Sequence, residues 1–282
     1  MSPRLPDFLI AGAAKCGTTA VAEYMGQHPR VYMSPLKEPK FMSSHFMTFP
    51  YKGPGDDFVE AFTIKDFKEY KQLFRWARGR MVLGEASVES LYYYDRIIPL
   101  IKRYLGDIRI IIVLRNPVDR AFSAYKMLVR DGRETSTFEE ALEKEEERKG
   151  KNWEYIWHFK DGGFYYAQVK AYLDNFSNVK VMLFEDLRDH AVAFMQELYR
   201  FLGVRDNFVP KISLKLNSSG ALRNGFYRLL FRATGFKGML YKFLSLNGVS
   251  DSVLLNAIEA VRDGELEPLH LQAETRIRLA RT

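Results

Sequence analysis

Cysteine is almost absent from this chain of 282 residues, in which Cys16 is the only one. No internal disulfide can therefore form, and no metal site built from several cysteines is available. The sequence also lacks any continuous apolar run near the ~18 residues that a membrane-spanning helix needs. The first expected strand begins by residue 8, which leaves no room for a signal segment. We therefore expect a soluble, cytoplasmic protein without a membrane span, although a domain excised from a longer chain would have the same features.

Neither sign of charge dominates, because 42 Lys and Arg against 35 Asp and Glu give a net charge of +7. This excess suits anionic ligands, but a solvated cationic face explains it equally well. An apolar content of 47% lets the chain bury a large core, in one α/β domain or two smaller ones.

Residues 8–20 predict a short buried strand, a loop and the start of a helix. Gly12 and Gly17 enclose four residues, which is the glycine frame of a loop that cradles phosphate with backbone N–H groups. Nucleotide triphosphatases place lysine directly after the second glycine, whereas here Thr18 stands there and Lys15 lies inside the loop. The pattern retains an anion site with a repositioned cation, and a plain tight turn remains the alternative.

Residues 109–114 form the strongest strand pattern, a β-branched run typical of a central parallel strand covered on both faces. The strand ends in Arg115, at the edge where open α/β sheets bind ligands. Ser123 follows eight residues later, two turns into the next expected helix. The alternatives are a helix-capping ion pair for Arg115 and an ordinary surface position for Ser123.

Further strands are expected over residues 31–33, 80–86 and 179–184, and helices over residues 65–75, 96–105, 165–176 and 194–202. After the strand at 31–33, a proline-rich loop carries Glu38 between Lys37 and Lys40, and these cations would keep its carboxylate ionised. A surface loop with an incidental salt bridge is the competing interpretation.

Residues 130–164 change character, with dense mixed charge over 139–151 followed by an aromatic stretch. The charged run predicts a solvated helix, and the aromatics either line an acceptor site or cover the core. We consider this segment a candidate mobile element over the active site. Residues 215–224 predict a linker or a second phosphate-contacting loop, and the part from about 225 is expected to be helical.

The glycine loop and the strand ending in Arg115 together resemble the sulfotransferases that use 3′-phosphoadenosine 5′-phosphosulfate (PAPS), in particular the Golgi heparan-type enzymes and their bacterial relatives. The similarity extends over about residues 7–223. Further matches are Lys37-Glu38-Pro39, Gly84-Glu85-Ala86-Ser87, Glu185-Asp186-Leu187 and Asn217-Ser218-Ser219-Gly220-Ala221-Leu222-Arg223. The resemblance implies an α/β fold, with a P-loop-like parallel sheet and helices on both faces, in one sulfotransferase domain over residues 1–282.

The resemblance also implies roles for individual residues. PAPS would be the donor, with its 5′-phosphosulfate on the first loop and its 3′-phosphate on Arg115 and Ser123. Lys15 and Glu38 would be catalytic, Glu38 as the general base with Glu85 as the alternative. The implied donor-binding residues are Lys15, Cys16, Gly17, Thr18, Thr19, Ala20, Arg115, Ser123 and Arg223. The implied acceptor-binding residues are Lys40, Glu85 and Ser87.

Two departures concern the acceptor. The heparan enzymes usually carry His where this chain has Lys40, and often Lys where it has Ala86, so a heparan acceptor is not expected. The hydroxyl acceptors that remain are a glycan, a lipid or polyketide, including one held on a carrier, or another small molecule. No nucleic acid partner is expected, and the oligomeric state is not predicted.

The expected chemistry also stands on the residues themselves. In-line sulfuryl transfer resembles phosphoryl transfer, so catalysis consists of positioning and charge stabilisation. Lys15 would neutralise the leaving phosphate, and Glu38 would accept the proton of the attacking hydroxyl. No metal is expected, because a sulfuryl group carries less charge than a γ-phosphate. Two rivals remain, namely a P-loop small-molecule kinase using ATP and Mg²⁺, and a non-catalytic polyanion-binding module.

Overall fold

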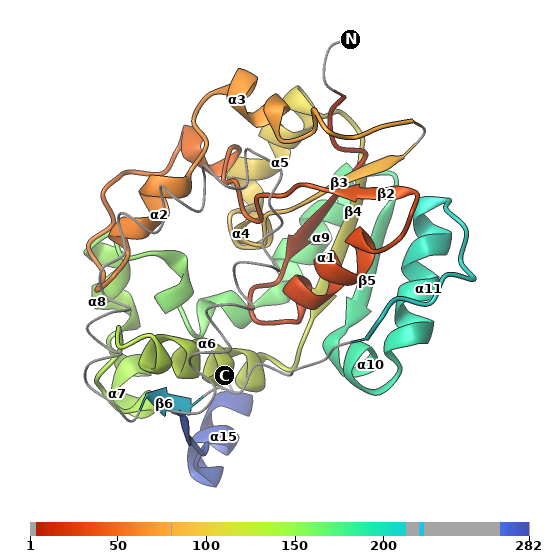
Figure 1. Ribbon diagram of the computed structural model, residues 1–282. Helices are drawn as coiled ribbons and strands as arrows, with labels where there is room; N and C mark the ends of the chain where they lie inside the picture. Colours follow the sequence, from red (N-terminus) through yellow and green to blue (C-terminus); the bar gives the residue numbers. More distant parts are fainter. Residues whose placement is uncertain (1–3, 80, 213–219, 223–265, 282) are drawn as a thin grey trace.

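A five-stranded, fully parallel β-sheet forms the centre of the protein, in a computed structural model that describes residues 4–79, 81–212, 220–222 and 266–281 (Figure 1). The spatial order of its strands is β2-β3-β1-β4-β5. The strands are β1 (Phe8–Gly12), β2 (Val31–Met33), β3 (Val82–Ala86), β4 (Arg109–Leu114) and β5 (Val179–Leu183). Strand β1 lies between β3 and β4, where every one of its residues is buried.

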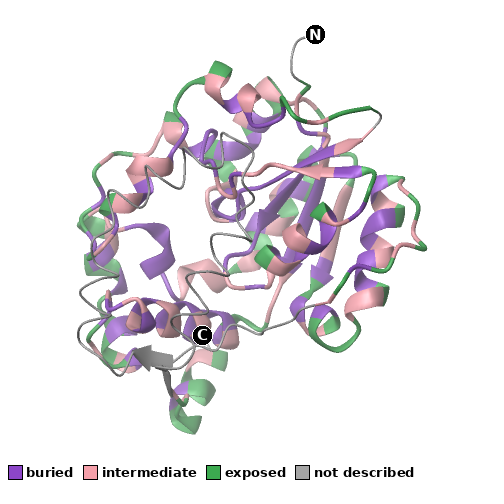
Figure 2. Ribbon diagram, viewed as in Figure 1, coloured by how far each residue is buried: buried purple, intermediate pink, exposed green. Residues whose placement is uncertain are grey.

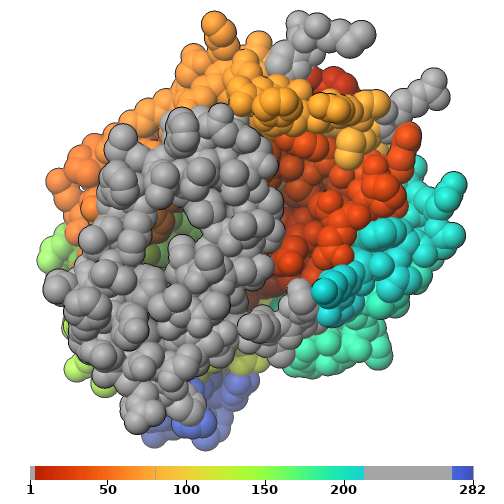
Figure 3. All heavy atoms as spheres, viewed as in Figure 1, coloured from red at the N-terminus to blue at the C-terminus, as the bar shows by residue number. Residues whose placement is uncertain are grey.

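Helices cover both faces of this sheet, as expected. Helices α1 (Thr18–Gly26) and α11 (Ala191–Leu202) pack on one face, and α4 (Glu89–Tyr92), α5 (Tyr94–Tyr104) and α9 (Tyr165–Asn175) pack on the other (Figure 1). The hydroxyl of Tyr199 on α11 donates a hydrogen bond of 3.1 Å to the carbonyl oxygen of Tyr24 on α1. In the surface view, the N-terminal residues in red accordingly adjoin the α11 region in cyan (Figure 3). The predicted α/β class is therefore confirmed.

The remaining elements connect these layers. They are η1 (Ser43–His45), α2 (Asp57–Phe62), α3 (Phe67–Gln72), α6 (Pro117–Arg130), α7 (Phe138–Glu143), α8 (Glu145–Gly150), η2 (Tyr155–Trp157), η3 (Asp161–Gly163), α10 (Phe184–Asp189), β6 (Gly220–Leu222), β7 (Leu266–Pro268) and α15 (Ala273–Ala280). Strands β6 and β7 pair in antiparallel fashion as a separate two-stranded sheet.

Two apolar cores hold the fold together, and buried residues concentrate in the sheet and in α6 (Figure 2). The larger core surrounds the sheet, and the smaller one lies between α6 and the segment that contains α7, α8 and η2. Trp157 and Phe159 are fully buried in the smaller core. These two aromatic residues therefore cover a core, and the mobility of residues 130–164 remains a prediction.

Several expected boundaries differ from the structure. The charged run over 139–151 forms two short helices, α7 and α8, because the chain turns at Lys144. The strand expected over 179–184 stops at Leu183, since Phe184 begins α10, and α11 begins at Ala191, three residues before the expected start. The expected helical part from about 225 lies outside the described residues as far as residue 265. No helix in the described ranges combines the length and apolar character of a bilayer-spanning segment.

Candidate active site

The loop between β1 and α1 has the backbone geometry of an anion cradle. Lys15 and Gly17 adopt left-handed conformations, with φ of 71° and 80°. A Cβ atom at Gly17 would meet Phe184 at 2.8 Å and Leu187 at 2.9 Å, so glycine alone fits there. The backbone N–H of Ala13 donates to the carbonyl of Val113 at 2.8 Å, which anchors the loop to β4. Helix α1 begins at Thr18 directly after this loop, and the first N–H groups of a helix have no partner within the helix.

Lys15 supplies a cation within this loop. Its ammonium contacts the sulfur of Met127 on α6 at 3.2 Å, and it forms no ion pair with a carboxylate of the described residues. Burial, followed by the positive charges of Arg130, Lys37 and Arg115, lowers the pKa of Lys15 to about 7, while Asp131 opposes this shift. A cation held in this way is stabilised by a bound anion, which fits a phosphate-bearing ligand.

Arg115 lies at the carboxyl end of β4 and reaches back to the same loop. Its Nη1 donates to the carbonyl oxygen of Lys15 at 3.4 Å. Its guanidinium lies 4.6 Å from the centre of the Phe184 ring, and this ring also fills the space beside Gly17. The structure therefore brings together the two segments that the sequence singled out.

Tyr165 adds a second link between these segments. Its hydroxyl donates to the carbonyl oxygen of Arg115 at 3.1 Å and lies 3.8 Å from the sulfur of Cys16. Burial raises the pKa of Cys16 to about 11, so its thiol is neutral near pH 7. Sequence reasoning missed Tyr165 and Phe184, because each begins a helix with an ordinary pattern and gains its role through contacts with distant residues.

The other predicted donor-binding residues are placed as follows. Thr18 is buried and Thr19 is exposed at the start of α1, and Ala20 is half-buried. Ser123 is half-buried on α6. Arg223 lies outside the described residues. Their contacts with a donor remain predictions.

Glu38 sits on a loop that is tied to the sheet. Its backbone N–H donates to the carbonyl of Ala86 at 2.8 Å, so the loop lies against the carboxyl end of β3. Burial by itself would raise the pKa of Glu38, but Lys37, Lys40 and Lys15 outweigh burial and lower it. The carboxylate forms an ion pair with Lys37 and a longer one, at 3.8 Å, with Lys40. It is therefore ionised near neutral pH and can accept a proton.

The three predicted acceptor-binding residues are all buried and have partners inside the protein. Lys40 is 1% exposed and forms ion pairs with carboxylates. Glu85 accepts hydrogen bonds from the hydroxyls of Tyr70 and Ser87, and burial raises its pKa to about 7 although these bonds oppose the shift. Acceptor contact by these three residues stays a prediction.

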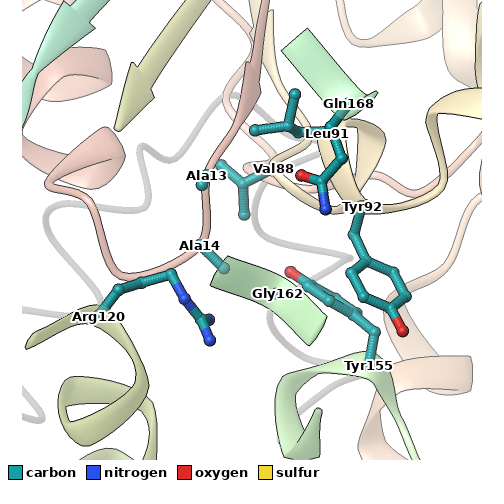
Figure 4. A pocket seen from close by; sticks show the side chains of 9 residues that line it. All are labelled: Ala13, Ala14, Val88, Leu91, Tyr92, Arg120, Tyr155, Gly162 and Gln168. Atoms are coloured by element: carbon teal, nitrogen blue, oxygen red, sulfur yellow. The ribbon is translucent and has the colours of Figure 1, made fainter. Parts of the chain in front are cut away.

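A small pocket opens beside the β1–α1 loop, which contributes Ala13 and Ala14 to its lining (Figure 4). It is lined by Ala13, Ala14, Val88, Leu91, Tyr92, Arg120, Tyr155, Gly162 and Gln168. Arg120 is 3% exposed, donates to the carbonyl oxygen of Phe159 and forms no ion pair with a described carboxylate. The sequence offered one signal for Arg120, since it lies three residues before Ser123 and therefore near it on the same helix.

One group of acidic side chains in the described part of the chain is close enough to hold a cation. It consists of Glu145, Glu146 and Asp161. Lys149 forms ion pairs with all three carboxylates, which already balances much of their charge. This group contains none of the predicted site residues.

The profile of the sulfotransferase family matches residues 6–207. The chain belongs to the sulfotransferase family. The crystal structure of a sulfotransferase from Alicyclobacillus acidocaldarius is 39% identical to it and has a TM-score of 0.73. The match covers 90% of this sulfotransferase and 99% of the bacterial chain.

Two curated relatives are more distant. Human carbohydrate sulfotransferase 15 is 25% identical over 172 residues, and the human bifunctional heparan sulfate N-deacetylase/N-sulfotransferase 2 is 25% identical over 215 residues. These matches cover 49% and 71% of this sulfotransferase, and 30% and 22% of the respective relatives. The matched region thus spans less than a third of either relative. The predicted family is therefore confirmed, and neither the kinase nor the polyanion-binding alternative is favoured.

Proposed function

We propose that this enzyme transfers the sulfuryl group of PAPS to a hydroxyl group of an acceptor. The observation that carries the proposal is the 3.4 Å contact between the Arg115 guanidinium and the backbone of Lys15. This contact supports the proposal, because the residue proposed to bind the 3′-phosphate lies against the loop proposed to bind the 5′-phosphosulfate. PAPS carries both groups, whereas ATP has no 3′-phosphate.

The charges of the site support an anionic donor. Within the described residues, neither Lys15 nor Arg115 has a carboxylate ion-pair partner. Residues 15–20 would hold the 5′-phosphosulfate through backbone N–H groups and the Thr18 and Thr19 hydroxyls. Arg115 would hold the 3′-phosphate with charge-assisted hydrogen bonds, together with Ser123 and Arg223.

Two residues would carry the chemistry. As the acceptor oxygen forms its bond to sulfur, the bond from sulfur to the 5′-phosphate oxygen breaks, and the electron pair stays on that phosphate. Lys15 would neutralise the resulting charge. Glu38 would take the acceptor's proton, which contributes about 10²–10⁴ in rate when a general base is well placed. The products are a sulfate ester and adenosine 3′,5′-bisphosphate.

The acceptor is proposed as a class only. The names of the curated relatives, which refer to carbohydrate and to N-sulfation of heparan sulfate, support a glycan as the acceptor. Lys40 and Ala86 differ from the heparan-type pattern, so a heparan acceptor is not proposed. Another glycan, a lipid or polyketide hydroxyl, free or carrier-bound, and another small molecule remain in the proposal. A cytoplasmic location likewise remains a prediction.

Titration calorimetry with adenosine 3′,5′-bisphosphate and with ATP plus Mg²⁺ tests the donor. We expect the bisphosphate to bind at least tenfold more tightly. Preference for ATP would indicate a kinase. Steeply salt-dependent heparin binding without nucleotide preference would indicate a polyanion-binding module. Co-crystallisation with the bisphosphate would then identify the donor contacts and the adjoining acceptor cleft.

A further inference from the structure

Lys40 occupies an unusual position for a lysine. Its side chain is 1% exposed, and its backbone is left-handed with φ of 55°. The ammonium lies 3.8 Å from a carboxylate oxygen of Glu38, 3.8 Å from one of Glu89 and 3.5 Å from one of Glu154. It also lies 5.5 Å from the centre of the Tyr155 ring. One buried cation therefore joins three separate parts of the chain.

These partners come from different elements. Glu38 belongs to the loop after β2, Glu89 begins α4, and Glu154 immediately precedes η2. Both Glu89 and Glu154 are nearly inaccessible to solvent, as is Lys40. Because a buried charge is costly unless it is paired, the lysine and the carboxylates depend on one another. An acceptor could reach the ammonium only by displacing one of these carboxylates.

We propose that Lys40 is a positioning residue, which keeps the Glu38 carboxylate ionised and fixes its loop to α4 and to the segment before η2. This inference rests on the proposed function only in naming Glu38 as the base. It replaces the direct acceptor contact that the resemblance implied for Lys40. Tyr155, the first residue of η2, lines the pocket beside the β1–α1 loop, so the ammonium of Lys40 lies near both the candidate base and this pocket.

Other charged and titratable groups surround the cluster of Lys40 with Glu38, Glu89 and Glu154, and some of them also act on the charge of Glu38. Lys37 contacts Glu38 directly, so Lys40 is the second cation on that carboxylate. Arg133 lies 3.8 Å from the second oxygen of Glu154 and also pairs with Asp56. The groups that form or face this cluster are Lys15, Lys37, Glu38, Tyr51, Asp56, Glu89, Tyr93, Arg133, Glu154 and Tyr155. Among the described ion pairs, Lys40 is the cation shared by Glu38, Glu89 and Glu154.

Carbon-13 NMR of glutamate side-chain carboxyls tests the proposal without donor or acceptor. The Glu38 resonance is identified by its loss in Glu38→Gln. In the unmodified enzyme we expect its titration midpoint to lie below the ordinary pKa value for a glutamate. In Lys40→Met the midpoint should move upward by about one pH unit, because a nearby positive charge is lost.

Three further variants separate charge from packing. Lys40→Arg retains the positive charge, so Glu38 should stay ionised. Glu89→Gln removes a negative charge near Glu38, so Glu38 should stay ionised in this variant too. Lys102→Met is the matched control, because Lys102 is exposed and pairs with Asp107. Calorimetry with adenosine 3′,5′-bisphosphate should give unchanged affinity in Lys40→Met, which also shows that the variant is folded.

Two results would overturn the proposal. One is a Glu38 midpoint that does not move in Lys40→Met, and the other is protonation of Glu38 in Glu89→Gln, which charge cannot explain. If Lys40→Met does not fold, the Glu89→Gln result decides. Failure of the base assignment has a different signature, namely full sulfation activity in Glu38→Gln. Failure of the proposed function has another, namely tighter binding of ATP than of adenosine 3′,5′-bisphosphate. Neither result changes the NMR midpoints.

Discussion

The guanidinium of Arg115 lies 3.4 Å from the carbonyl oxygen of Lys15, a residue 100 positions earlier in the chain. The order of the sheet accounts for this contact. Strand β1 pairs directly with β4 in parallel, so the residues that follow each strand emerge at the same edge. Phe184 strengthens the junction, because its ring packs against the guanidinium and beside Gly17. The donor site proposed above depends on this junction.

Arg115→Ala should remove recognition of the 3′-phosphate. We expect affinity for adenosine 3′,5′-bisphosphate to fall by about 10–100-fold, the effect of losing a charge-assisted hydrogen-bonded contact, while affinity for adenosine 5′-monophosphate stays unchanged. Calorimetry with both nucleotides measures the difference. Arg109→Ala, at the opposite end of β4, is the matched control and should change neither value. Equal losses for the two nucleotides would contradict the assignment.

Glu38→Gln and Lys15→Ala should differ in a diagnostic way. Both should lower turnover, Glu38→Gln by about 10²–10⁴-fold as expected for loss of a general base. Only Lys15→Ala should also weaken binding of adenosine 3′,5′-bisphosphate. Product formation by mass spectrometry and calorimetry on the same preparations provide the two measurements. Near-normal turnover in Glu38→Gln would shift the base assignment to Glu85.

Donor binding should take up a proton above neutral pH. The pKa of Lys15 is lowered to about 7 by burial and neighbouring cations, so its amine is mostly neutral at pH 8. A bound phosphate stabilises the protonated form and raises this pKa, so a proton enters on binding. Calorimetry at pH 8 in buffers of different ionisation enthalpy should detect close to one proton per bisphosphate, and the uptake should vanish below pH 6. Lys15→Met is the control and should show none of this uptake.

Glu85 should make stability depend on pH. Burial raises its pKa to about 7 in the folded protein, above its ordinary value. Its contribution to stability is therefore complete below about pH 4.5 and is lost as the pH rises through 7. Glu85→Gln should remove this loss, so the variant gains on the order of 2 kcal/mol relative to the parent between pH 5 and 8. Thermal unfolding of both proteins at several pH values measures this difference in stability. A difference that stays constant with pH would contradict the prediction.

Gly17→Ala, in the β1–α1 loop, should lower the free energy of unfolding more than Gly79→Ala does. Gly79 also has positive φ, at 64°, but an added Cβ there meets no atom within 4 Å. Gly79→Ala thus reports backbone strain alone, about 1 kcal/mol. Gly17→Ala adds overlap with Phe184 and Leu187, so the free energy of unfolding should fall by a further 1–3 kcal/mol or so. Denaturant unfolding compares them, and bisphosphate affinity should drop only in Gly17→Ala.

Local pattern determined the parts of this protein that depend on neighbours along the chain. In the β-branched run at 109–114, residues 110–113 are buried in β4. The two glycines enclose a loop in which Lys15 and Gly17 are left-handed. The charge of Glu38 also followed from its adjacent lysines, because ions a few residues apart interact whatever the fold. These features required no knowledge of distant contacts.

Tertiary structure alone decided which distant residues meet. Nothing in the spacing around Lys40 indicates that Glu89 and Glu154 surround its ammonium, or that Tyr165 joins Arg115 to Cys16. Such contacts arise from strand order and helix packing, and burial then gives them their strength by removing water from the charges. The sequence therefore specified the glycine loop between β1 and α1, and the packing around it determined the surroundings of the candidate base.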